Sequence, residues 1–197
     1  MAKPKFSQTR VEQTINLKDE FGIDFKGFKS LREAIGEAVL NQIRTRTARG
    51  DGMNFRGIGG TPTKLKKPYS DEYIENLDFK AFGKSRGRIN MTLTGDMLGL
   101  MDVKKQTGNS ITIGWDDAEQ NAKAYNHSSP VRSNTTVPYR PFFGVSKKEL
   151  TKIKKQFGKE IKSAMRLKDD GKKKAFEERV AKLLTIFKDK LVDVNDG

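Results

Sequence analysis

The sequence predicts an α+β fold: a small antiparallel sheet with an N-terminal amphipathic helix and a C-terminal helical extension. The first observation is an apolar stripe at intervals of three and four positions, which is typical of a helix that packs on a core. The stripe consists of Phe28, Leu31, Ile35, Val39 and Ile43. The second observation is strict alternation over residues 110–115, where Ile111, Ile113 and Trp115 share one face of a strand.

The chain divides into an N-terminal arm over residues 1–27, an α+β core domain over 28–145 and a C-terminal helical extension over 146–197. The arm mixes polar and apolar residues, and we expect it to be flexible, with at most a short strand at 22–25. In the core, Ser30 and Glu33 have the spacing of a capping box, and Gly50 suits a helix end. These signals predict a helix over about residues 30–49.

The middle of the chain predicts short elements. Five Gly and two Pro in residues 50–68 favour an irregular loop. A short helix capped by Ser70 follows, and Asp96 caps a helical turn that runs to residue 100. Strands over 101–105 and 110–115 form a hairpin, and residues 118–127 form a short helix.

In the extension, the sequence predicts two helices, over about 147–167 and 172–192. Ser146 and Glu149 form a second capping box. One apolar stripe in each helix supports this interpretation. Because these stripes are longer than a small sheet can cover, we expect part of them to pack on a neighbouring subunit or partner.

Composition narrows the classes of function. The chain has 197 residues, of which 35% are hydrophobic and 32% charged, and it has no Cys. Disulfides and Cys-based zinc sites are therefore excluded. No apolar run approaches the roughly 18 residues of a membrane span, and no secretory signal is evident. We expect a soluble intracellular protein that carries a net charge of +14 and attracts polyanions.

No motif predicts catalysis. His127 is the only histidine, and it lacks the neighbours that a zinc site or a catalytic pair requires. Gly83, Lys84 and Ser85 copy the end of a P-loop, but Asp78 stands where the motif requires Gly. We therefore expect no enzyme activity, no cofactor and no metal, and a structural role for His127.

The aromatic and basic run at 139–143 has two interpretations. Its rings could stack on nucleobases between the basic groups. Alternatively, Pro138 and Pro141 fix the approach to the next helix and Phe142 or Phe143 is buried before it, which is the simpler account.

Several short sequence motifs, here called boxes, together resemble the bacteriophage virion morphogenesis family, the tail-completion or neck proteins of tailed phages. They are IRTRTARGDG (43–52), PYS with Tyr73, LTGDML (93–98), ITIG (111–114), AYNH (124–127) and VPYRPFFGVS (137–146). Their order and spacing carry the resemblance, which covers about residues 28–160. The family implies a structural subunit that forms a homo-oligomeric ring at the neck or tail end and contacts adjoining neck, connector or tail proteins. It implies a location in the virion, and in the host cytoplasm during assembly.

A neck ring surrounds the path of the DNA, so scattered basic residues could face the lumen and offset the phosphate charge without reading sequence. The candidates for the lumen or for a subunit interface are Arg44, Arg46, Arg49, Lys64, Lys66, Lys67, Arg140, Phe142 and Phe143. We expect Arg140 to bridge subunits. Alternatively, the basic residues face acidic patches on adjoining rings. The competing function is that of a basic nucleic-acid-binding protein.

Overall fold

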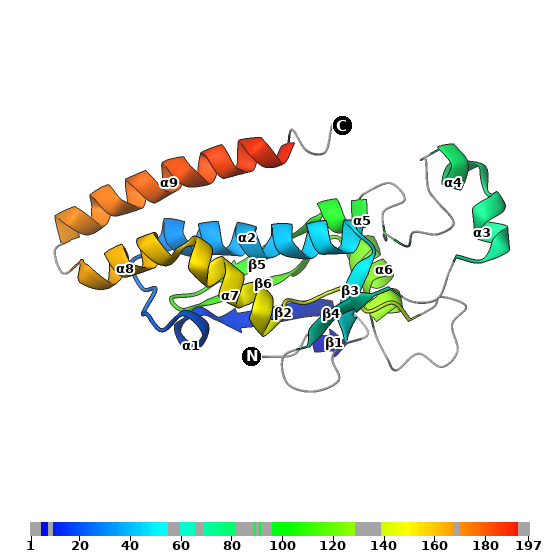
Figure 1. The fold of residues 1–197 in the computed structure, drawn as a ribbon, viewed down its shortest axis with the longest axis horizontal. Coiled ribbons are helices and arrows are strands. Elements are labelled where there is room, and N and C mark those ends of the chain that lie inside the picture. Colours follow the sequence, from blue (N-terminus) through cyan, green and yellow to red (C-terminus); the bar gives the residue numbers. More distant parts are fainter. Residues whose placement is uncertain are drawn as a thin grey trace.

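The computed structural model describes residues 5–7, 10–54, 60–65, 69–81, 89, 91, 96–128, 139–167 and 170–192. It mixes helices with two small antiparallel sheets, which confirms the predicted α+β class. A long helix, α2, lies along one face of the larger sheet, and the C-terminal helices flank it (Figure 1).

The larger sheet has the strand order β1-β2-β6-β5, and its neighbouring strands are antiparallel. Strand β5 spans Met101–Gln106 and β6 spans Ser110–Trp115. They form the predicted hairpin, with Ile113 opposite Val103. The alternation expected for β6 is present, because Ile111, Ile113 and Trp115 are buried in the core.

The expectation of a flexible N-terminal arm is wrong for residues 10–16. Strands β1 (Lys5–Ser7) and β2 (Arg10–Asn16) lie in the larger sheet, and residues 12–16 of β2 pair with β6. Val11, Gln13 and Ile15 point into the molecule, and Gln13 accepts a hydrogen bond from the N–H of Val145 (3.1 Å). The sheet therefore depends on a strand from outside the predicted core domain. A short helix, α1 (Leu17–Phe21), follows it, and residues 22–25 form no strand.

Helix α2 spans Lys29–Ala48 and buries the predicted stripe. Gly36 allows it to approach the sheet closely, since a Cβ there would lie 2.9 Å from Val103 Cγ2. The predicted capping box is absent, because Phe28 is the N-cap and makes no side-chain hydrogen bond. The Ser30 N–H donates instead to Glu177 of helix α9 (Asp170–Val192) at 2.6 Å, so a carboxylate from another helix stabilises the positive end of α2.

The region 50–68 contains a hairpin where an irregular loop was expected. Strand β3 (Asp51–Asn54) pairs with β4 (Thr61–Lys64), and the intervening 55–59 lie outside the described residues. Gly50 adopts φ = 81°, a conformation that glycine accepts without strain and that turns the chain from α2 into β3. Gly and Pro suggested a loop because neither residue favours a strand.

The predicted short helices are present. Helix α3 (Asp71–Glu75) has Ser70 as its N-cap, and α4 (Leu77–Ala81) follows it. Helix α5 (Asp96–Gly99) lies beside β6, where the Trp115 indole donates to the Met97 carbonyl (2.5 Å). Helix α6 spans Ala118–Ser128.

The C-terminal extension consists of α7 (Lys147–Gln156), α8 (Gly158–Arg166) and α9 (Asp170–Val192). The capping box of Ser146 and Glu149 is formed, as predicted. The helix expected over 147–167 breaks at Phe157, before Gly158. Helix α9 turns back to pack on α2 (Figure 1). The rings of Phe28 and Phe176 meet edge to face, with centroids 5.7 Å apart. No helix among the described residues is long and apolar enough to span a membrane.

Candidate functional site

A buried ion pair joins α2 to the extension. The Nη1 group of Arg46 donates to both carboxylate oxygens of Glu149, at 2.8 and 2.9 Å. Its Nη2 group donates to the carbonyls of Phe142 (2.6 Å) and Gly144 (2.8 Å). The exposed fractions are only 5% for Arg46 and 3% for Glu149. The planar guanidinium thus connects α2, residues 142–144 and α7 at one point. We call this arrangement the Arg46 node.

Glu149 has further donors besides Arg46. The N–H and the hydroxyl of Ser146 each donate to its Oε2 at 2.8 Å, and Gln42 donates to Oε1 at 3.1 Å. Burial alone raises the pKa of Glu149, but the charge of Arg46 and the hydrogen bonds from Ser146 and Arg46 outweigh it, so the pKa lies below its usual value. Burial lowers the pKa of Arg46, and Glu149 counteracts this. Free arginine titrates far above neutral pH, and the pKa of Glu149 is lowered. Both groups are therefore ionised at neutral pH.

A cleft of about 600 Å³ lies beside the node. Its walls are the C-terminal half of α2, the start of the β3–β4 hairpin and one face of α7. Amide and hydroxyl groups provide much of the lining, and Ala38, Pro62 and Ile153 add apolar surface. The polar members are Asn41, Gln42, Thr45, Thr61 and Gln156.

The cleft has an excess of positive charge. Arg46 and Glu149 compensate each other, and Asp51 is paired with Lys64 of the hairpin at 2.7 Å. The other charged lining groups are Arg49, Lys148 and Lys152, which are exposed. Within the described part of the chain, none of the three forms an ion pair. The cleft can therefore accept an anionic group without breaking an existing pair.

Several of the candidate residues are buried in the structure, which for Phe142 and Phe143 agrees with the simpler account of the 139–143 run. Arg46 is buried in the node, and Phe142 and Phe143 are fully buried against Trp115, with ring centroids 6.2 and 5.0 Å from it. Arg44 is half-buried and donates to the carbonyls of Leu98, Gly99 and Met101. In this conformation these side chains make contacts within the chain, and their expected role at the lumen or at an interface stays a prediction.

Arg140 is also buried, with an exposed fraction of 4%, and it belongs to a separate aromatic cluster. Its guanidinium lies 4.9 Å from the ring centre of Tyr69. The rings of Tyr69, Tyr73 and Phe79 pack on one another, with centroids 5.2–5.4 Å apart. Arg140 thus makes a contact within the chain beside α3 and α4, and its expected role as a bridge between subunits stays a prediction. We call this group the Arg140 cluster.

Of the remaining candidates, Arg49 and Lys64 are exposed at the cleft and the hairpin, whereas Lys66 and Lys67 lie outside the described residues. The carbonyl of His127 accepts a hydrogen bond from the N–H of Arg140 (2.7 Å). The described residues contain no group of three or more His, Cys, Asp or Glu placed to hold a metal ion.

Sequence reasoning missed the node itself, although it identified one half of it. The Ser146–Glu149 capping box was recognised, but the partner of Glu149 lies 103 positions away in the sequence. A usable signal was present: Arg46 follows Ile43 by three positions and so continues the buried stripe of α2. A charged residue on a buried face requires a partner of opposite charge.

Comparisons of this chain with protein-family models, with curated proteins and with solved structures found no match.

Proposed function

We propose that this chain is a structural subunit of a phage neck or tail-completion ring, which joins head and tail during assembly. The observation that carries the proposal is the meeting of two boxes of the family resemblance at the Arg46 node. The box at 43–52 supplies Arg46, and the box at 137–146 supplies the two carbonyl groups and Ser146. The residues that carry the resemblance therefore fix the positions of these two segments relative to each other, and we call this arrangement a frame.

A frame of this kind suits a repeating subunit. A buried arginine with a bidentate carboxylate and two carbonyl partners admits few alternative arrangements, since each change leaves a charge or a carbonyl without its partner. The node fixes α2, α7 and the 139–146 segment relative to one another. A ring requires the same surfaces on every copy, and such a fixed frame provides them.

The proposal is tested by inactivating the gene in the phage that carries it and examining the products by electron microscopy. We expect DNA-filled heads and separate tails, and joined particles should return when the wild-type chain is supplied in trans. Normal, infectious particles without the chain would contradict the proposal.

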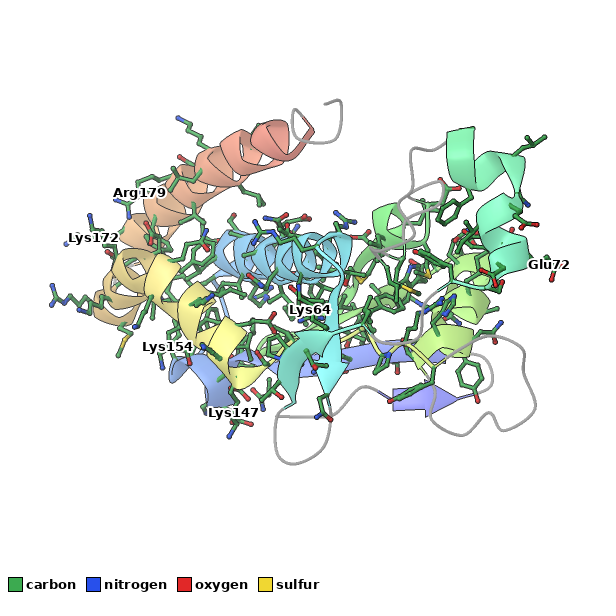
Figure 2. All side chains as sticks on the ribbon, turned by 45° about the vertical axis from the view of Figure 1, so that its right-hand side comes forward. Lys64, Glu72, Lys147, Lys154, Lys172 and Arg179 are labelled. Atoms are coloured by element: carbon green, nitrogen blue, oxygen red, sulfur yellow. The ribbon has the colours of Figure 1, made fainter. Side chains whose placement is uncertain are left out.

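The second candidate, a nucleic-acid-binding protein, rests on the basic surface of the extension. Figure 2 shows Lys147, Lys154, Lys172 and Arg179 projecting outward from α7 and α9. Such a surface attracts phosphates through charge, so affinity should fall steeply with salt. Tight DNA binding with that salt dependence, together with normal head–tail joining in the absence of the chain, would favour this candidate.

A further inference from the structure

One segment of this basic protein is acidic and stands apart. Residues 71–78 contain Asp71, Glu72, Glu75 and Asp78 and no Lys or Arg, in a chain whose net charge is +14. They form α3 and the start of α4, which lie at one end of the molecule, away from the sheet (Figure 1). Glu72 points away from the body of the protein (Figure 2). We call residues 71–81 the acidic arm.

The acidic arm presents a mixed surface to solvent. Glu72 and Glu75 are exposed, and neither forms an ion pair within the described residues. Leu77, the first residue of α4, has an exposed fraction of 81%, the largest among the exposed large apolar side chains of the described residues. An apolar side chain flanked by carboxylates is a typical anchor for a protein partner with a basic, partly apolar surface.

The acidic arm is also held in a defined position. Tyr69 and Phe79 are buried, and the Arg140 cluster connects the arm to the segment that enters the Arg46 node. An arm ordered before binding loses less conformational entropy on docking than a free segment would.

The cleft between α2, α7 and the β3–β4 hairpin has the complementary properties. Arg49, Lys148 and Lys152, which form no ion pair within the described residues, are opposite in charge to the carboxylates of the arm. The apolar lining of the cleft includes Pro62, which is exposed and can receive a leucine. A nucleic-acid backbone would match the charge but would leave the apolar surfaces of both the arm and the cleft uncovered.

We propose that the acidic arm of one copy docks into the cleft of a second copy, with Glu72 and Glu75 against Lys148 and Lys152. The contact joins two different surfaces, so its repetition propagates from subunit to subunit and closes into a ring when the rotation permits. This inference deepens the proposed function by naming the contact between subunits. A single small contact of this kind is weak, and closure of a ring strengthens it by multivalency.

The experiment uses charge reversal in the full-length chain. The arm variant is Glu72→Lys/Glu75→Lys, and the cleft variant is Lys148→Glu/Lys152→Glu. The control is Lys159→Glu/Lys162→Glu, which makes the same charge change as the cleft variant on exposed positions of α8 outside the cleft. Sedimentation velocity over a concentration series measures self-association, and thermal melting verifies that each variant is folded.

We expect the wild type and the control to associate at low salt, and each of the two test variants to lose association by on the order of 100-fold, because like charges face each other at the junction. Mixing the arm variant with the cleft variant should restore association, since every junction in the mixture again joins opposite charges. The chain that carries all four changes should also associate, and its net charge equals that of the wild type.

A wild type that remains monomeric, a cleft variant that behaves like the control, or a mixture that does not associate would overturn the inference. A cleft variant that loses DNA binding but retains self-association would overturn it in favour of DNA. These outcomes are separate from the test of the virion role. If the charge-reversal variants behave as expected but particles without the chain are normal, the docking stands and the neck function is contradicted. If particles without the chain fail to join heads and tails but the charge reversals do not affect association, the neck function stands and the docking is contradicted.

Discussion

Two buried arginines are associated with the 139–146 segment, and their surroundings differ: Arg46 donates to its carbonyl groups, and Arg140 belongs to it. Arg46 has the carboxylate of Glu149 and two carbonyl groups within hydrogen-bond distance. Arg140 lies over the ring of Tyr69. Burial lowers the pKa of Arg140, and Tyr69 and Tyr73 counteract this. Arg46 thus faces a full opposite charge, whereas the ring face of Tyr69 beside Arg140 supplies a quadrupole.

The surroundings of the Arg46 node and of the Arg140 cluster also differ in how they pack against the main core. The Arg46 node borders the main core, and Phe142, Phe143, Leu150 and Ile153 belong to that core. Tyr69 and Phe79 are buried but lie outside it. We therefore expect the acidic arm to open locally at a lower free energy than α2, because it has fewer apolar contacts of its own.

The largest effect is expected at the node. Glu149→Gln leaves Arg46 buried without its counter-charge, and we expect a loss of about 3–5 kcal/mol in the free energy of unfolding. Urea denaturation measures it, with Glu178→Gln on the exposed face of α9 as the control. The double variant Arg46→Met/Glu149→Gln should cost less than the sum of the single changes. Additive losses would show that the two residues do not act as a pair.

The next effect concerns Gly52, which lies where β3 passes the 139–146 segment. A Cβ there would overlap the carbonyl oxygen of Pro141 and the side chain of Leu65. Gly52→Ala should therefore destabilise the protein by about 1–3 kcal/mol through overpacking. Gly158→Ala is the matched control, because a Cβ at Gly158 meets nothing within 4 Å. Equal melting temperatures for the two variants would contradict the close approach at Gly52.

A smaller and local effect is expected at the Arg140 cluster. Arg140→Met removes a desolvated cation from the ring of Tyr69, which is worth up to about 2 kcal/mol. Amide hydrogen exchange should accelerate in α3 and α4 and stay nearly unchanged in α2. The control is Arg179→Met, which removes an exposed cation 5.4 Å from the ring of Phe176. Uniform acceleration across the chain would contradict a separate cluster.

The smallest effect concerns pH and sharpens the account of the node. The folded pKa of Glu149 is lowered, so its contribution to stability is complete above the ordinary value for glutamate, about 4.3. That contribution is lost as the pH falls through the lower, folded pKa. The difference in stability between the wild type and Glu149→Gln should therefore narrow in acid. A constant difference down to the acid transition would contradict the role of the ionised carboxylate.

Local periodicity predicted much of the fold. The α2 stripe, the β5–β6 hairpin and the capping box of α7 are each encoded within a few neighbouring residues. Strand β2 was missed because its partner is distant, with Thr14 opposite Thr112, and because Gln13 interrupts the apolar face with a polar side chain. The β3–β4 hairpin was missed because its glycines and Pro62 resemble a loop.

The candidate site was less predictable than the fold. Charge suggested that Arg44, Arg46, Arg49 and Arg140 serve similar purposes, but only Arg49 is exposed at the cleft. The others have partners that lie far away in the sequence, such as Leu98 for Arg44. Composition reports how many charges a chain has, whereas tertiary contacts decide which of them remain available to a partner.

The most direct test of the proposed ring subunit is the copy number of this chain in purified particles of the phage that carries its gene. Quantitative mass spectrometry against the major capsid protein gives that number, and particle imaging with an antibody locates the chain. We expect a small, constant number of copies per particle, all at the head–tail joint. A chain absent from purified particles, or present in amounts that vary between preparations, would contradict the account.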